Sequence, residues 1–464
     1  MVAIPVMSGI VADGTDFRTA FPLNLVPVPK TTGLSEGYLK PASGIVTVAD
    51  AGGANRGGYR WRGVHYRVMG NNFISVTDAG VMVTIGTVAG IDWVTFDESF
   101  DHLAINGGGN LYMYDGTTFT QVTDVDLGTS IDVVWVNGYF VSTDGEFLIS
   151  SDINDPFSYN VLRYASSEVS PDPVVALQKI RSEIYAVNRY SIEVFGAIIE
   201  PGTAFPFARI EGAQITKGAV GSRACCEFMQ ALAFVGSGPN DPPSVWLGSS
   251  AQAAKISTRD IDAELQSYSD AVLSTVVVES RADLGHDFLY IHLPSKTLVY
   301  DGNASAAIGQ PVWHVLNSGA GYRARGFVWC YGQWNVADPF GTKIGVLSDA
   351  VGSHYGDAVQ WEFVTPIAYN EGRGVQVHEL ELMALSGDIA VGDDPMIATS
   401  YSLDGETWSQ PRYIRAGRMG ERTKRLVWDR QGSFRNWRVQ RFQGDSRAHL
   451  SFARLEARFE VLAV

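Results

Sequence analysis

The sequence contains few residues of the kinds that build disulfide frameworks or membrane spans. Only three of its 464 residues are cysteines, Cys225, Cys226 and Cys330. This odd number, with two cysteines adjacent, does not indicate a disulfide framework, because neighbouring cysteines strain the bridge geometry. No apolar run approaches the ~18 residues that a membrane span needs, and no signal peptide is visible at the start. We therefore expect synthesis in a reducing cytoplasm and no membrane span.

Charged residues are also scarce, at 18% of the chain, compared with about a quarter in an average protein. Glycine is abundant at 49 residues, and aromatic residues make up 11%. This composition favours short strands and tight turns over long helices. A length of 464 residues predicts two domains, or one large β-domain with an appendage.

Sequence signals of catalysis and metal binding are missing as well. The chain has no GxGxxG after a predicted strand, no Walker phosphate loop and no HExxH. His286 and His292 lie six positions apart on a predicted strand, too far for one metal ion. Adjacent carboxylates such as Asp97-Glu98 are typical of turns and surfaces. We expect no enzyme activity, and no catalytic, cofactor-binding or metal-binding residues.

The pattern along the chain predicts an all-β protein. Residues 1–55 are irregular and rich in proline and turns, which predicts an extended arm. Residues 56–356 contain hairpins that recur about every forty residues, with turns such as Asn137-Gly138 and Asp144-Gly145. This spacing favours an irregular β-propeller of six or seven blades. A pair of ordinary β-sandwiches is the rival interpretation.

Two segments depart from the blade pattern. Residues 257–273 have helical spacing, with Ser257 or Thr258 as a plausible N-cap. Residues 357–464 alternate apolar and polar side chains, with a phase shift near His378. They predict a separate antiparallel β-sandwich or jelly roll. The SLDGETW sequence in this segment predicts a turn in which the Asp404 carboxylate accepts hydrogen bonds from backbone amides and the Trp408 ring packs on the sheet.

The predicted sandwich is the basic part of the chain. Residues 401–464 hold 13 Lys and Arg against 7 Asp and Glu, a net charge of +6, whereas the whole chain carries −15. A basic face can bind an acidic partner or phosphates without reading sequence. The candidate docking or channel residues are Arg425, Arg430, Arg435, Arg438 and Arg441. The alternative is a solvated face whose arginines point outward while its aromatic residues point inward.

Several stretches of residues 10–350 are informative through their order and spacing more than through any one of them. The stretches are Asp16-Phe17-Arg18, Leu25 to Lys30, the run from 142 to 177 (STDGEFLISSDINDPFSYNVLRYASSEVSPDPVVAL), Tyr190 to Phe195, Lys217-Gly218, Gly221-Ser222, Ile261 to Leu265, His292 to Pro294, Thr297 to Asp301, and Trp313 to Leu316. Together they resemble the packaged-DNA stabilisation proteins, or tail hubs, of short-tailed bacteriophages.

This resemblance implies a structural virion protein of the tail that forms a homo-oligomeric ring, a hexameric nozzle below the portal and its adaptor. Such a hub retains packaged double-stranded DNA, provides the channel for its ejection, and carries the tail needle and the tailspikes or fibres. The resemblance brings no cofactor and no active site. The alternatives are a carbohydrate-binding or carbohydrate-active propeller, which needs convergent carboxylates, and a propeller scaffold for host proteins.

Overall fold

The computed structural model describes residues 2–30, 37–198, 205–249, 251–390 and 392–462. Contacts divide the chain into two compact units. One unit comprises residues 47–294 and 323–346, and the other comprises residues 1–46, 295–322 and 347–464. The domain boundaries expected at residues 55 and 356 stay a prediction. No helix in the described ranges is long and apolar enough to span a membrane.

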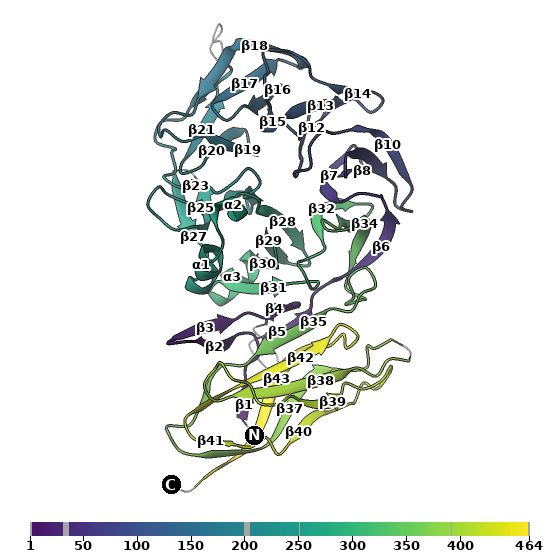
Figure 1. Ribbon diagram of the computed structural model, residues 1–464, viewed down its shortest axis with the longest axis vertical. Helices are drawn as coiled ribbons and strands as arrows, with labels where there is room; N and C mark the ends of the chain where they lie inside the picture. Colours follow the sequence, from purple (N-terminus) through teal and green to yellow (C-terminus); the bar gives the residue numbers. More distant parts are fainter. Residues whose placement is uncertain (1, 31–36, 199–204, 250, 391, 463–464) are drawn as a thin grey trace. The chain divides into compact units, whose positions relative to one another are not determined.

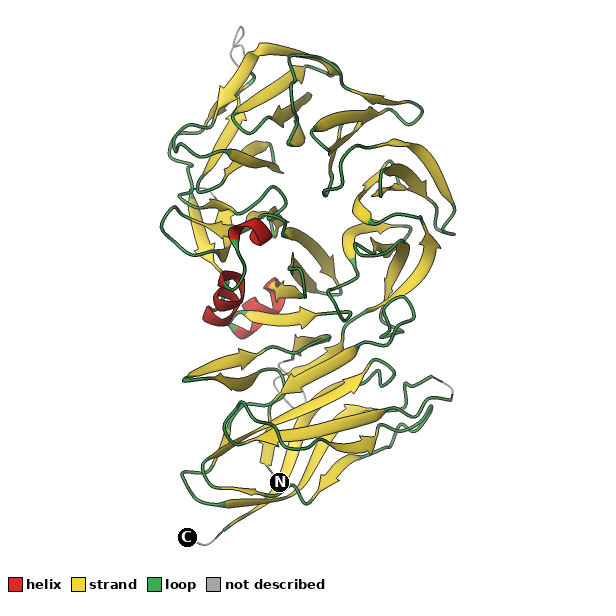
Figure 2. Cartoon of the chain, in the orientation of Figure 1, coloured by secondary structure: helices red, strands yellow, loops and turns green. Residues whose placement is uncertain are grey.

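The first unit is built of antiparallel sheets that follow one another along the chain, seven of them within the described residues (Figures 1 and 2). The predicted propeller is therefore confirmed. The first two sheets contain β7 (Asn55–Trp61), β8 (Val64–Met69), β9 (Asn72–Val76), β10 (Met82–Thr87), β11 (Thr95–Glu98), β12 (Leu103–Gly107), β13 (Asn110–Tyr114) and β14 (Phe119–Gln121). The next two contain β15 (Asp132–Val136), β16 (Tyr139–Thr143), β17 (Phe147–Asp152), β18 (Asp155–Ser166), β19 (Val174–Ile180), β20 (Glu183–Asn188), β21 (Ile192–Ala197) and β22 (Phe207–Arg209). The last three contain β23 (Gly218–Ala219), β24 (Cys225–Phe228), β25 (Ala231–Ser237), β26 (Ser244–Ser249) and β27 (Gln252–Lys255), then β28 (Val277–Asp283) with β29 (His286–His292), then β32 (Arg325–Cys330), β33 (Gln333–Ala337), β34 (Lys343–Ser348) and β6 (Gly44–Asp50).

Tight turns fix the register within these sheets. Asn137 and Gly138 have positive φ angles of 51° and 93° between β15 and β16, as a two-residue hairpin turn requires. At the next turn, Oδ1 of Asp144 accepts hydrogen bonds from the amides of Glu146 and Phe147. Short polar residues at these positions thus supply both the backbone geometry and the acceptors that a turn needs.

A strand that precedes the first blade completes the last sheet. Strand β6 is the fourth strand of the sheet that contains β32, β33 and β34, and the amide of Ala51 donates to the carbonyl of Thr342 at 2.9 Å. Closure of this kind joins the first blade to the last, and the outer strands keep unpaired sheet edges. It also ties the two ends of the propeller together.

The first strands of consecutive sheets line the middle of the propeller, whereas β10, β14 and β18 lie at its rim (Figure 1). Acidic side chains connect neighbouring inner strands, because a carboxylate on one strand accepts a hydrogen bond from a backbone amide of the next. The carboxylates and amides are Asp97 with Trp135, Asp132 with Leu177, and Glu279 with Gly326. These bonds satisfy amides that face another blade, which a sheet ladder cannot do.

The helix predicted at residues 257–273 is present as two short helices, α1 (Arg259–Gln266) and α2 (Asp270–Leu273). Thr258 is the N-cap of α1, and its side chain accepts a hydrogen bond from the amide of Ile261. Ile261 and Leu265 are buried. The helical spacing seen in the sequence therefore marks the side of α1 that packs inward.

The second unit contains the predicted β-sandwich (Figure 1). One sheet runs β4 (Leu25–Pro29), β5 (Gly37–Pro41), β43 (Ser451–Val461), β37 (Val375–Leu385) and β40 (Leu426–Asp429), with β1 (Val2–Ile4) paired to β43 and β41 (Ser433–Phe434) paired to β37. The other runs β35 (Gln360–Val364), β42 (Trp437–Asp445), β38 (Met396–Ser402) and β39 (Arg412–Arg415), with β36 (Ala368–Tyr369) also paired to β42. The unit also holds the hairpins β2 (Gly9–Asp13) with β3 (Asp16–Ala20) and β30 (Thr297–Asp301) with β31 (Val312–Leu316), and the helix α3 (Gly302–Ile308).

The two sheets of the sandwich enclose an aromatic core. Trp361, Phe363, Phe442 and Phe452 are buried together there, and their rings lie 4.8–6.3 Å apart. The phase shift predicted near His378 corresponds to a register shift in β37 between Val377 and Glu379. An extra residue at a β-bulge returns the apolar side chains to the core face.

Candidate functional site

The five candidate arginines occupy different surroundings in the sandwich. Arg425 is exposed and pairs with Glu381 through Nε at 2.7 Å and Nη2 at 2.6 Å. This bidentate contact raises the pKa of Arg425 and lowers the pKa of the Glu381 carboxyl. Arg430 and Arg435 are exposed, at either end of the loop that leads from β40 through β41. Their side chains have no ion-pair partner among the described residues.

Arg438 and Arg441 lie three positions apart on β42 and therefore point to opposite faces of its sheet. Arg441 is half-buried, stacks on the ring of Trp408 at 4.3 Å and donates to Ser400. Arg438 is 4% exposed and points inward. The prediction that these arginines point outward is wrong for Arg438, because Trp437 takes the outer position and Phe442 the inner one. The five arginines thus do not share one face.

Arg438 belongs to a polar network between the two sheets. Its Nε and Nη2 atoms donate to Oε1 of Gln440 at 3.1 and 2.8 Å, and Nη1 donates to the carbonyl of Gln431 at 2.6 Å. Nε2 of Gln440 donates to Oγ1 of Thr399 at 2.6 Å. The guanidinium also lies 4.0 Å from the ring centre of Tyr401. Burial lowers the pKa of Arg438 to about 10, since a low dielectric disfavours the charged form.

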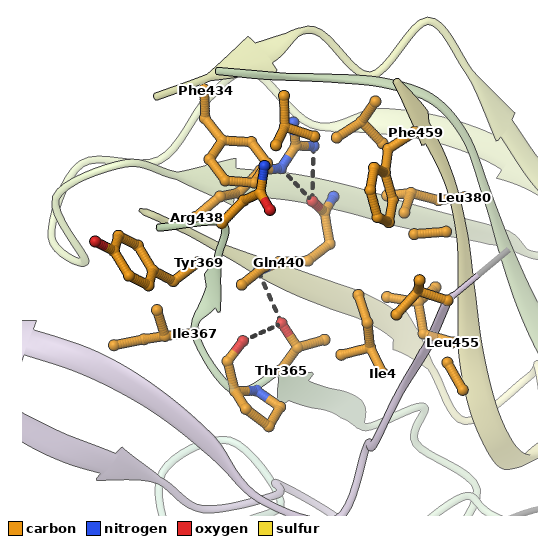
Figure 3. A pocket seen from close by; sticks show the side chains of 18 of the residues that line it. Ile4, Thr365, Ile367, Tyr369, Leu380, Phe434, Arg438, Gln440, Leu455 and Phe459 are labelled. Carbon is orange, nitrogen blue, oxygen red and sulfur yellow. Dashed lines mark hydrogen bonds between the residues drawn. The ribbon is translucent and has the colours of Figure 1, made fainter. Parts of the chain in front are cut away.

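This network lines a pocket of about 300 Å³ at the side of the sandwich (Figure 3). Figure 3 shows Arg438 and Gln440 reaching into the pocket from one sheet, with Leu380 and Leu455 on the other. The walls are mostly apolar. The lining residues are Val2 to Pro5, Thr365 to Asn370, Val375, Val377, Leu380, Phe434, Arg438, Gln440, Leu455, Ala457 and Phe459. We call this space the sandwich pocket.

A second cavity of about 300 Å³ lies among inner strands of the propeller. Its lining contains Glu279 as the one carboxylate among the described residues, together with Arg223, Gln178 and Ser280. The oxygens of Glu279 already accept from the amide of Gly326 at 2.9 and 3.0 Å and lie 3.1 Å from His292. Glycoside hydrolysis uses two carboxylates across the bond to be cleaved. This cavity does not provide that pair.

The SLDGETW turn has the local geometry predicted from the sequence. Oδ1 of Asp404 accepts from the amides of Glu406 and Thr407 at 3.0 and 2.8 Å. These bonds, with those from the Ser402 and Thr407 hydroxyls, hold the pKa of Asp404 well below its usual range. The turn therefore has a structural role in the connection between β38 and β39.

Two sequence profiles cover this arrangement of domains. A profile described as bacteriophage P22 Gp10, beta-propeller, matches residues 2–352. A second, described as bacteriophage P22 Gp10, beta-sandwich, matches residues 360–460. The chain belongs to the P22 Gp10 family. The resemblance to phage tail hubs inferred from scattered stretches is thereby confirmed, and it extends through the basic sandwich.

One relative agrees with membership in the P22 Gp10 family. The chain is 27% identical over 460 residues to the tail hub protein gp10 of Salmonella phage P22, covering 93% of this chain and 94% of the relative.

Solved structures of low similarity include the WD40 domain of Neurospora crassa Pan2, at 10% identity and a TM-score of 0.42 over 67% of this chain and 97% of that one. Another is virginiamycin B lyase from Staphylococcus aureus, at 11% identity and a TM-score of 0.42 over 64% and 94%.

The sandwich pocket is the feature that sequence reasoning missed. Arg438 was singled out, but for an outward face. The strict alternation of β42 carries the signal, because Arg438, Gln440 and Phe442 share one face and the burial of Phe442 fixes that face as the inner one.

Proposed function

We propose that the chain is a tail-hub subunit of a short-tailed bacteriophage, a structural and non-enzymatic protein located in the tail of the virion. The observation that carries this proposal is the match to a tail hub protein across both domains, over 93% of this chain and 94% of the relative. A piece of a hub grafted onto another protein would not match over both full lengths. The absence of catalytic motifs in the sequence agrees with a structural role.

The finer role follows from the same likeness. The subunits form a closed homo-oligomeric ring, a hexamer, below the portal and its adaptor. This ring retains packaged DNA, provides the channel for its ejection, and carries the needle and the tailspikes or fibres. A ring of identical subunits uses heterologous contacts, in which two different surfaces of the chain meet. A propeller suits this use because its closed arrangement of blades is a stable body with different surfaces for two neighbours.

Electron microscopy of virions and of the purified chain tests the ring. We expect a closed ring of identical subunits at the tail in wild-type particles, and particles without this ring when the gene carries a nonsense mutation. Measurement of DNA in the mutant particles by quantitative PCR tests retention, with a complementing plasmid as the control. Complete tails that hold DNA in the absence of the protein would overturn the proposal.

The exposed arginines of the sandwich are the residues we propose for contact with an acidic partner or with DNA phosphates. Arg430 and Arg435 are suited to this, because both are exposed and neither has an ion-pair partner among the described residues. Arg425 is less suited, since its charge is matched by Glu381. Contacts of this kind weaken as salt concentration rises. Salt-dependent binding of duplex DNA by the purified chain would therefore support a channel position for this surface.

A further inference from the structure

The sandwich pocket lies where the two sheets of the sandwich present their edges. Strand β1 pairs with β43 and forms the margin of one sheet beside the pocket. Strand β36 pairs with β42 and forms the margin of the other. Residues of both strands line the pocket. Within the described ranges neither strand has a second neighbour in its sheet at this side, so the backbone groups of two strand edges flank the pocket.

The charge of Arg438 is buried in this pocket without a carboxylate partner. Its donors reach only neutral oxygens, those of Gln440 and Gln431, and the lining contains no Asp or Glu among the described residues. The neighbouring groups that act on its charge are the phenol of Tyr401 and the guanidinium of Arg412, neither of them a carboxylate. A buried cation without a counter-charge is unfavourable. An anion that entered the pocket would therefore gain a strong, charge-assisted interaction.

A second donor in the pocket has no hydrogen-bond partner in the described part of the chain. This donor is Nδ2 of Asn370, which is shielded from solvent and belongs to a residue of the pocket lining. A buried amide group is normally satisfied. Among the polar residues of the lining, Arg438 and Asn370 thus offer donors, whereas most of the wall is apolar. The chemistry that completes this site is a carboxylate attached to an apolar body.

We propose that the sandwich pocket binds an extended, apolar peptide segment of a partner protein, which adds to the edge of β1 or β36 and places a carboxylate against Arg438 and Asn370. Strand addition satisfies the backbone edges that flank the pocket, while alternate side chains of the added strand enter it. A volume of about 300 Å³ matches the lower end of the range for small binding sites, enough for a few side chains. This proposal does not depend on ring formation.

Selection of random short peptides displayed on a carrier, against the full chain, tests the proposal directly. We expect enrichment of peptides in which apolar residues alternate and one Asp, Glu or C-terminal carboxylate recurs at a fixed place. A synthetic peptide from this set should bind in fluorescence anisotropy, and its isosteric amide version should bind roughly tenfold or more weakly. No enrichment, or enrichment of peptides without a carboxylate, would overturn the proposal.

Two kinds of variant locate the binding site. Arg438→Met removes the charge but leaves Gln440 and Gln431 short of donors, so its fold must be checked by circular dichroism. Ala368→Phe adds a bulky side chain to the pocket lining, opposite Arg438 on the neighbouring strand, and keeps the charge of the arginine. Ala390→Phe is its matched control, because Ala390 is an exposed alanine of the sandwich outside the pocket lining. We expect loss of peptide binding with Ala368→Phe and unchanged binding with Ala390→Phe.

Equal binding by the wild type and Ala368→Phe would place the peptide elsewhere and refute the site. Concentration-dependent dimerisation of the chain, abolished by Ala368→Phe, would instead identify the occupant as a second copy and overturn the assignment to a partner. These measurements read peptide binding, whereas the hub is tested by ring formation and by DNA retention in particles. A failure of one proposal is therefore distinguishable from a failure of the other.

Discussion

Asp132 is the side chain at which loss of one charge should weaken the propeller most. It is 1% exposed and lies at the start of the inner strand β15. Its Oδ1 atom accepts from Thr95 at 2.8 Å and its Oδ2 atom accepts from the amide of Leu177 at 3.0 Å. Nη1 of Arg223 lies 3.4 Å from Oδ1 as an ion pair, although it is not aligned as a hydrogen bond. Asp132 thus connects β11, β19 and Arg223, which lies two residues before β24.

The substitution Asp132→Asn keeps the shape of the side chain and replaces one acceptor oxygen by a donor. Oδ1 also accepts from the amide of Val133 at 2.9 Å, so the asparagine oxygen stays at that position and its NH2 group faces the amide of Leu177. Arg223 then keeps its charge without this carboxylate. Removal of one member of a buried ion pair costs about 3–5 kcal/mol. We expect the free energy of unfolding of the propeller to fall by about that amount.

Urea unfolding and residue-resolved hydrogen exchange measure this effect. The amide of Leu177 should exchange faster in Asp132→Asn, because it loses its acceptor, while amides of the sandwich should be unchanged. Asp101→Asn is the matched control, since Asp101 is 84% exposed and its ion pair with Arg62 is 3.6 Å long. Exposed pairs contribute little. An unfolding free energy for Asp132→Asn within error of that control would refute the reasoning.

Three further predictions concern buried and exposed groups. His65 is 0% exposed, its Nε2 accepts from Nε of Arg67 at 3.1 Å, and burial holds its pKa well below 6.5. Because only the unfolded state then binds the extra proton, the stability of the propeller should fall as pH drops below 6.5, by up to about 1.4 kcal/mol per pH unit. In urea titrations, His65→Gln should flatten this slope. Burial raises the pKa of the Cys225 thiol to about 12, so iodoacetamide at pH 8 should label it only in unfolded protein, as read by mass spectrometry. Reversal of Arg430 and Arg435 to Glu should leave the melting temperature unchanged but impair tail assembly or DNA retention in particles. Variant particles that assemble and hold DNA normally would show that these two charges only face solvent.

Local patterns predicted the elements of the fold because turn chemistry and side-chain alternation are local. Asn137 and Gly138 specify a hairpin turn by backbone geometry alone, and Thr258 specifies a helix start. The pairing of β6 with the sheet of β34 was not visible in the same way. It joins segments about 300 residues apart in the chain, and no local preference encodes such a partner.

The sandwich pocket was beyond prediction for a related reason. It is formed by β1, β36, β42 and the facing sheet, which converge from both ends of the sequence. In the sequence, Arg438 is one of several arginines alternating with apolar residues. Whether it points inward depends on the register of β42 against β36 and β38, and a shift by one residue would exchange its face with that of Trp437.

The basic character of the sandwich therefore has two parts that different variants can separate. Several of its surface arginines are matched by nearby acids, such as Arg425 by Glu381 and Arg447 by Asp445. The surplus lies partly in exposed residues such as Arg435 and partly in the buried Arg438. Reversal of Arg435 changes the surface field without touching the pocket. Arg438→Met changes the pocket while removing almost no surface charge. If only the reversal of Arg435 impairs DNA retention and only Arg438→Met abolishes peptide binding, the sandwich uses separate arginines for two contacts. Its exposed arginines then contact an acidic partner or DNA phosphates, and its buried arginine contacts the peptide.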